Sequence, residues 1–195
     1  MSWGLPFQRM ADIRDLIIKC KKGDRLSQYF LFERMKRRWM GVCYRYVGNT
    51  AEADDVFQES AIKILSSIDQ LRDIDLFDAW AKRIVINQAI NHLKARNSYS
   101  IAVDSYSETS GDREEGEEEI IGNMNAEELL AMINTMPEGY RMVFSLYMID
   151  GYKHREIAEA LNISEATSRS QLKKARKCLR TKIEQIKPEK NAKIV

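Results

Sequence analysis

The sequence predicts an all-α protein made of two small helical domains that are joined by a flexible acidic linker. Apolar residues recur at helical spacing along most of the 195 residues, and only nine Gly and three Pro interrupt them. Residues 98–122 hold one Lys or Arg against eight Asp or Glu, which gives a net charge of −7 between flanking segments of +5 and +4. The second flanking segment ends in a helix-turn-helix pattern.

The first domain is predicted to span residues 1–97. The expected helices cover Asp12–Lys22, Asp24–Val47, Ala51–Ile68 and Leu76–Arg96. Gly23 ends the first helix, Gly48 and Asn49 close the second, and Thr50 is expected to cap the third. A polar break that contains Arg72 separates the third helix from the fourth.

Acidic and carboxamide side chains gather near the start of the third helix: Asp54, Asp55, Gln58 and Glu59. Acids near a helix N-terminus are favoured by the helix dipole, by a few tenths to about 1 kcal/mol, which is one explanation. The alternative is a docking patch for a basic partner.

The fourth helix has one polar stripe on an otherwise apolar surface. At 100° per residue, Trp80, Arg83, Asn87, Asn91 and Lys94 fall within about 80° of one another. Carboxamides and Arg bond to base edges, and an exposed aromatic ring stacks on an unpaired base. A core position for Trp80 is the competing interpretation. Asn is a poor helix former, so Asn87 and Asn91 within one helix indicate a function.

The second domain is predicted at residues 123–187, followed by a loose polar tail at 188–195. Pro137 restarts a helix that runs from Glu138 to Ile149 and that Gly151 ends. The helix-turn-helix follows, with its first helix near Glu156–Leu161, a turn at Asn162–Ser164, and its second helix at Glu165–Arg180. Ser164 suits the N-cap of that second helix.

Two stripes run along the second helix of this pair. The inward stripe is Ser168, Leu172, Ala175 and Leu179, and the outward stripe is Arg169, Lys173, Arg176 and Arg180. Thr167 and Ser170 at the helix start are placed to reach phosphates or base edges. DNA contact and an ordinary solvated basic helix are both compatible with this pattern alone.

Three stretches together resemble a known family. They are Glu52–Glu59, the pattern Phe77-x-x-Trp80-x-x-Arg83-Ile84-x-x-Asn87, and a distal set: Met136-Pro137-x-x-x-Arg141-x-Val143-Phe144, Gly151-Tyr152, Glu156-Ile157-Ala158 and Lys174-Ala175-Arg176. In order and spacing they resemble bacterial RNA polymerase sigma factors of the sigma-70 family, specifically the short extracytoplasmic-function type. The resemblance covers about residues 10–182.

The resemblance implies that residues 1–97 are sigma region 2 and that residues 123–187 are sigma region 4. Region 2 would dock on the beta-prime clamp helices of core RNA polymerase, recognise the minus-ten promoter element and aid DNA melting. Region 4 would contact the beta flap and read the minus-thirty-five element. The acidic linker would thread a polymerase channel, and an anti-sigma factor is a further implied partner.

Residue by residue, the resemblance assigns three sets of contacts. For polymerase they are Asp54, Asp55, Gln58 and Glu59; for the minus-ten element Arg72, Trp80, Arg83, Asn87, Asn91 and Lys94; for the minus-thirty-five element Thr167, Arg169, Ser170, Lys173, Lys174 and Arg176. Asn91, Lys153 and Ser168 depart from the family's commonest residues, which are Asp, Ser or Thr, and Val. We expect these departures to affect promoter preference or stability.

The cysteines and histidines argue against several other classes of function. Cys20, Cys43 and Cys178 are odd in number and widely spaced, which predicts reduced thiols in a cytoplasmic protein and no zinc site. His92 and His154 stand far apart, and no nucleophile–base set, phosphate loop or cofactor motif appears, so we expect no enzyme, cofactor or small-molecule substrate. A one-component DNA-binding regulator and a helical scaffold or anti-regulator remain the alternatives.

Overall fold

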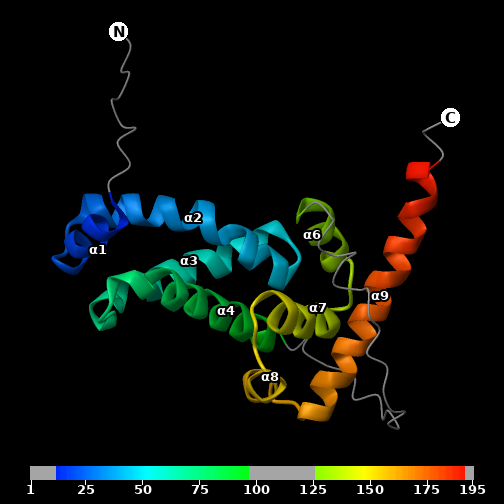
Figure 1. The fold of residues 1–195 in the computed structure, drawn as a ribbon. Helices are drawn as coiled ribbons and strands as arrows, with labels where there is room; N and C mark the ends of the chain where they lie inside the picture. Colours follow the sequence, from blue (N-terminus) through cyan, green and yellow to red (C-terminus); the bar gives the residue numbers. More distant parts are fainter. Residues whose placement is uncertain (1–11, 97–125, 192–195) are drawn as a thin grey trace. The chain divides into compact units, whose positions relative to one another are not determined.

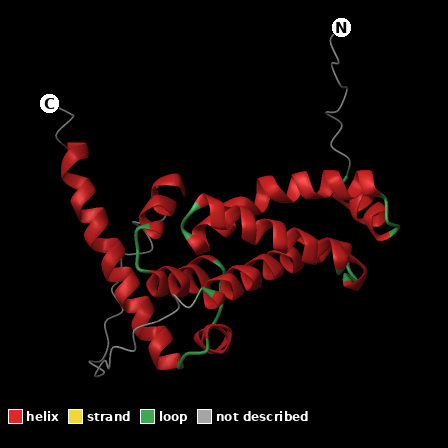
Figure 2. Cartoon of the chain, turned by 180° about the vertical axis from the view of Figure 1, so that it is seen from behind, coloured by secondary structure: helices red, strands yellow, loops and turns green. Residues whose placement is uncertain are grey.

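The structure, a computed structural model, describes residues 12–96 and 126–191, without the side chains of residue 126 and residues 186–191. Every regular element in these two ranges is helical, as Figures 1 and 2 show, which confirms the predicted all-α class. The predicted linker at 98–122 lies outside the described residues. The chain divides into two compact units. One consists of Met1–Tyr44 and Thr50–Ala89, and the other of Arg45–Asn49 and Ile90–Val195. The predicted domain limits at 97 and 123 stay predictions.

The helices of the first part of the chain match the predicted ones closely. They are α1 (Ile13–Lys21), α2 (Arg25–Val47), α3 (Thr50–Ser66) and α4 (Phe77–Ala95). The side chain of Asp12 accepts a hydrogen bond from the backbone N–H of Arg14 at 3.2 Å and so caps α1. Gly23, with φ of 79°, allows the chain to reverse before α2.

The apolar faces of α1 to α4 meet in one core. Its fully buried side chains include Ile17, Leu31, Met35, Cys43, Val56, Phe57, Ile64, Ala81, Val85 and Ala89. Between α2 and α3 the rings of Phe32 and Phe57 lie 5.1 Å apart between centroids. Arg38 of α2 also pairs with Asp78 of α4, at 2.9 Å.

Two expected boundaries in this region were wrong. Thr50 is the first residue of α3 and not its cap. The helix stops at Ser66, where Ser67 turns its hydroxyl back to the Lys63 carbonyl at 2.5 Å. Ile68 then begins a 3-10 turn, Ile68–Gln70, and a second such turn, Ile74–Leu76, leads into α4.

In the second part, α6 (Ala126–Asn134), α7 (Glu138–Phe144) and α8 (His154–Leu161) all contact the long helix α9 (Glu165–Asn191) (Figure 1). Pro137 precedes α7 as its N-cap, and Gly151, with φ of 76°, follows the helix as predicted. Asn162 takes φ of 55° between α8 and α9, a left-handed conformation that Asn tolerates better than most residues.

The structure differs from the sequence-based expectation at two places in this part. The helix predicted over Glu138–Ile149 changes after Phe144 into a π-helical turn, Ser145–Ile149, because the N–H of Asp150 bonds to the carbonyl of Ser145 five residues earlier. α9 runs on from Arg180 to Asn191, through residues that mostly favour helix, so the first half of the expected loose tail is helical.

All three cysteines are free thiols. Burial raises the pKa of Cys20 to about 11 and that of Cys43 to about 12, whereas Cys178 is half-buried on α9. Within residues 12–96 and 126–191 we find neither a helix long and apolar enough to cross a membrane nor a cluster of metal-ligating side chains.

Candidate nucleic-acid and polymerase interfaces

The polar stripe of α4 is a solvent-facing surface. Arg83, Asn87, Asn91 and Lys94 are exposed. The buried side chains of the helix are Phe77, Ala81, Val85, Ile86, Ala89, Ile90 and Leu93. Trp80 is half-buried: its ring lies 6.2 Å from the buried ring of Phe77 and is tilted by 46°. The structure therefore satisfies both interpretations of Trp80, because one part of the indole packs inward and the rest stays accessible.

The loop before α4 is held in place by α1. The ammonium of Lys21 donates to the Leu71 carbonyl at 2.5 Å, and Leu71 itself is buried. Arg14 pairs with Asp75 at the far end of the loop. Arg72 lies between these anchors with its side chain exposed. A fixed backbone on both sides limits the region that the guanidinium of Arg72 can sample.

Lys21 and Arg14 are positioning residues that reasoning from the sequence missed. They stand seven residues apart on α1, which places both on one side of the helix. That spacing was the available signal. It could not reveal the partners, because Leu71 and Asp75 follow about 50 to 60 residues later and reach α1 only through the tertiary fold.

On α3 the four predicted docking residues do not share one environment. Asp55, Gln58 and Glu59 are exposed. Asp54 is half-buried, and its carboxylate is 3.2 Å from the ammonium of Lys36 on α2. A carboxylate that already has a cation partner offers less to a second one, so the outward acidic surface of α3 is centred on Asp55 and Glu59.

The start of α9 is organised by its predicted cap. The Ser164 hydroxyl accepts a hydrogen bond from the N–H of Thr167 at 2.9 Å and lies 2.8 Å from the Thr167 hydroxyl. This confirms the capping role of Ser164. The Thr167 hydroxyl therefore already has a hydrogen-bond partner in the cap, although Thr167 also lies at the edge of the outward surface.

The two stripes of α9 are only partly separated as predicted. The inward residues Ser168, Leu172, Ala175 and Leu179 are buried, which confirms that stripe. In the outward stripe Arg169 and Lys173 are exposed, whereas Arg176 and Arg180 are half-buried. Arg176 also donates to the Met148 sulfur at 3.3 Å. Arg176 therefore faces only partly outward, because its guanidinium reaches Met148 of the π-helical turn Ser145–Ile149. Ser170 and Lys174 are half-buried.

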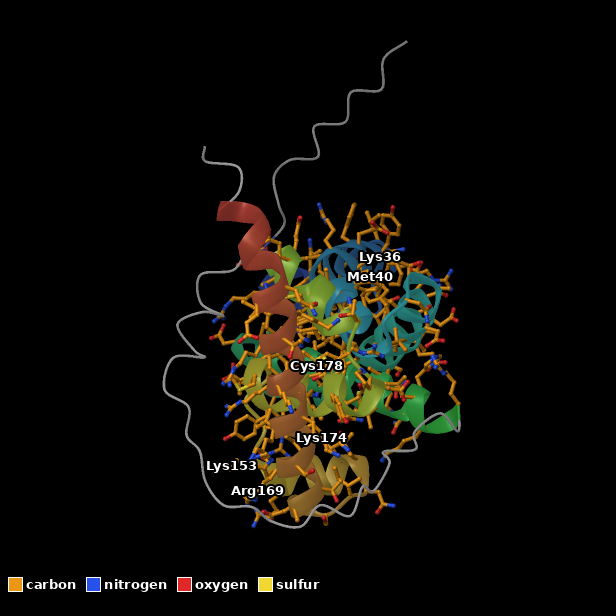
Figure 3. The ribbon with its side chains drawn as sticks, turned by 90° about the vertical axis from the view of Figure 1, so that its right-hand side faces the viewer. Lys36, Met40, Lys153, Arg169, Lys174 and Cys178 are labelled. Atoms are coloured by element: carbon orange, nitrogen blue, oxygen red, sulfur yellow. The ribbon has the colours of Figure 1, made fainter. Side chains whose placement is uncertain are left out.

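Exposed cations lie at the end of α9 where α8 meets it. Figure 3 places Lys153 and Arg169 at this end of the orange helix, with Lys174 and then Cys178 farther along it. Lys153 is exposed and precedes α8, and it was not among the predicted contacts. Its backbone N–H donates to the Glu156 carboxylate at 2.8 Å, which replaces the usual cap.

One acid opposes these cations. The Glu165 carboxylate lies 2.9 Å from the guanidinium of Arg169, one turn along α9, and both side chains are largely exposed. Such a pair contributes only about 0.3–0.5 kcal/mol to the helix, so a stronger anion such as a phosphate could displace it.

Comparison with known families matches both parts of the chain. The family described as "Sigma-70 region 2" matches residues 31–99, and "Sigma-70, region 4" matches residues 126–179.

Relatives align along nearly the whole chain. An "ECF RNA polymerase sigma-E factor" of Salmonella typhimurium is 30% identical over 178 residues, which cover 87% of this chain and 93% of that protein. The "ECF RNA polymerase sigma factor SigW" of Bacillus subtilis is 28% identical over 180 residues, with 88% and 96% coverage. Among solved structures, CnrH in complex with the cytosolic domain of CnrY aligns with a TM-score of 0.47 and 18% identity, covering 89% of this chain and 97% of that one.

The Glu165–Arg169 pair gives a first test of the α9 surface. Glu165→Gln should raise the affinity for duplex DNA about two- to fivefold at low salt, because it releases Arg169 and removes a negative charge from the surface. Fluorescence anisotropy with a labelled duplex measures this, and the gain should shrink at high salt. Glu159→Gln is the control, since it removes the same charge from the exposed Arg155–Glu159 pair on α8. Equal affinities for both variants would place the DNA surface elsewhere.

Proposed function

This chain belongs to the ECF RNA polymerase sigma factors of the sigma-70 family, and from that premise we propose which of its surfaces meet polymerase and promoter. It is a transcription initiation factor, not an enzyme: it joins core RNA polymerase and directs it to specific promoter DNA. The proposal concerns the residues that carry out the two recognitions and the partners' surfaces that receive them.

The α4 stripe is proposed to hold the minus-ten element as its strands part. The observation that carries this is that Asn87 and Asn91 are exposed on a helix that buries Val85, Ala89 and Leu93 in the core. Extruding a base costs a few kcal/mol, which the protein must offset with hydrogen bonds and stacking. Arg83 and the two carboxamides can bond to base edges, and the open part of Trp80 can stack on an unpaired base. Arg72, on its anchored loop, adds a cation beside the start of α4.

The α3 surface is proposed to dock on the beta-prime clamp helices. Asp55, Gln58 and Glu59 support this because they present two negative charges and a carboxamide on one exposed side of the helix. In this proposal Asp54 acts mainly within the protein, through its pair with Lys36. Charged side chains at the edge of an interface chiefly affect the rate and specificity of association.

The start of α9 is proposed to read the minus-thirty-five element as duplex DNA. Arg169 and Lys173 are the exposed cations of its outward stripe, and Ser170 lies between them near the helix N-terminus. Recognition helices contact base edges with these first residues. Lys174 and the part of Arg176 that reaches solvent would then bind phosphates, and the opposite side of the same unit would meet the beta flap.

Family membership also supports a regulatory partner and a cellular site of action. An anti-sigma factor that covers these surfaces would keep the protein from polymerase, and the cytoplasm is where polymerase works. Co-purification from cells, with and without added core enzyme, tests the partner, because an anti-sigma factor and polymerase should exclude each other.

The most direct experiment is transcription with purified core polymerase on fragments of genomic DNA. The chain should direct discrete transcripts that core enzyme alone does not produce. Mapping their start sites would give both promoter elements. A chain that binds DNA without polymerase and yields no such transcripts would instead be a DNA-binding regulator.

Charge reversal on α3 tests the docking surface. Asp55→Lys should weaken binding to core polymerase about tenfold, because a basic docking surface would meet a repelling charge. Surface plasmon resonance with immobilised core enzyme measures the change. The matched control, Asp15→Lys, reverses an exposed charge on α1 and should leave the affinity within about twofold of wild type. Similar losses in both variants would mean that net charge, and not this surface, governs binding.

Removal of one carboxamide tests the α4 surface. Asn87→Ala should reduce open-complex formation about tenfold while core binding stays unchanged, since a base-edge contact is worth about 1–3 kcal/mol. Permanganate reactivity of melted thymines reports this step. Gln88→Ala is the control, because it truncates the neighbouring, half-buried carboxamide beside the stripe. Wild-type melting by Asn87→Ala would remove this residue from the site.

A further inference from the structure

Ser168 is a buried hydroxyl on the inward stripe of α9, and His154 satisfies it. Ser168 has no exposed surface, and its Oγ lies 2.8 Å from Nδ1 of His154, the first residue of α8. A hydroxyl buried this completely is strongly disfavoured without a partner. The hydrogen bond therefore links the two helices of the helix-turn-helix near the N-terminal end of α9.

A third element fixes the imidazole. The Tyr147 ring, from the π-helical turn Ser145–Ile149, stacks on His154 with 4.5 Å between centroids and 23° between planes. The phenol ring of Tyr147 thus contacts the face of the imidazole, and the Ser168 hydroxyl contacts its edge at Nδ1. Three elements meet at this imidazole, and each contact has a defined direction.

The position of Ser168 decides what this link can control. Ser168 stands between Thr167 and Arg169, so any rotation of α9 about its axis at this point moves both neighbours by the same angle. Apolar packing of Leu172, Ala175 and Leu179 holds α9 farther along but tolerates small rotations. A 2.8 Å hydrogen bond tolerates much less, because its strength falls steeply with distance and angle.

We propose that the His154–Ser168 hydrogen bond, supported by the Tyr147 ring, sets the rotation of α9 and thereby its discrimination among minus-thirty-five sequences. His154 and Ser168 are positioning residues: they act through Arg169 and its neighbours and do not touch DNA. This inference rests on the proposed role of α9 in reading duplex DNA. The family often has Val at this position. The inference therefore gives Ser168 a function, which it performs together with His154.

The protonation of His154 agrees with this role. Burial, together with the positive charges of Arg169 and Arg176, lowers the pKa of His154, while Glu165 opposes them. The imidazole is therefore neutral near pH 7 and keeps one donor and one acceptor nitrogen. A neutral ring can pair with the Ser168 hydroxyl without placing a buried charge between the helices.

Two substitutions that are isosteric with each other test the proposal. Ser168→Thr keeps the hydroxyl, whereas Ser168→Val has a methyl group in its place, and both add one further methyl group. Run-off transcription is measured with the holoenzyme on two templates that share a minus-ten element, one with the mapped minus-thirty-five element and one with that element scrambled. The ratio of the two transcripts should fall about five- to tenfold for Ser168→Val and stay within about twofold of wild type for Ser168→Thr.

A double-mutant cycle tests the pair. His154→Phe keeps a ring to stack on Tyr147 but removes Nδ1, and it should lower the ratio as much as Ser168→Val does. The double variant should be no worse than either single variant, because both remove the same bond. Should Ser168→Val fail to fold by circular dichroism, His154→Phe and its ratio decide the outcome.

The ratio separates positioning from simple destabilisation. A less stable protein lowers transcription from both templates together and leaves their ratio unchanged, as the core variant Ile133→Val of α6 should show. Equal ratios for Ser168→Val and Ser168→Thr, or losses that multiply in the double variant, would overturn the inference. Absence of any dependence on the upstream element in the wild-type protein would instead refute the role proposed for α9 itself.

Discussion

The rotation of 100° between successive residues of an α-helix is the constraint on which the proposed recognition surfaces of α4 and α9 depend. In α9 the buried stripe of Ser168, Leu172, Ala175 and Leu179 fixes the side that packs, and the next residues, Arg169 and Lys173, then have to face solvent. In α4 the buried positions leave a single polar stripe in the same way. Each proposed recognition surface is therefore the complement of an apolar face, and a shift of the core would displace it.

Apolar faces set the side of a helix but not its fine orientation, and directional polar links supply that. The loop that carries Arg72 is tied to α1 through Lys21 and the Leu71 carbonyl. The first turn of α9 is tied to Ser164. These links join segments where the backbone leaves regular helix. There, packing alone does least to fix the orientation of the side chains.

Much of this organisation follows from the sequence, because the periodicity of apolar residues and the turn signals are local. The fold class, the boundaries of α1, α2 and α4, the Ser164 cap and the buried stripe of α9 were all predicted from such patterns. The pairing of Asp54 with Lys36 and the turning of Arg176 toward Met148 were not, because they depend on residues brought together by tertiary packing. The π-helical turn was missed for a related reason: its apolar residues fit an α-helical pattern equally well, and only the backbone bonds reveal the difference.

The raised pKa values of the two core thiols have a consequence for redox chemistry. With a pKa of about 11 for Cys20 and about 12 for Cys43, only on the order of one thiol in ten thousand, or fewer, is ionised at neutral pH. The thiolate is the nucleophile that attacks peroxides and disulfides. Oxidants that react through a thiolate should therefore react slowly with Cys20 and Cys43, which are also buried.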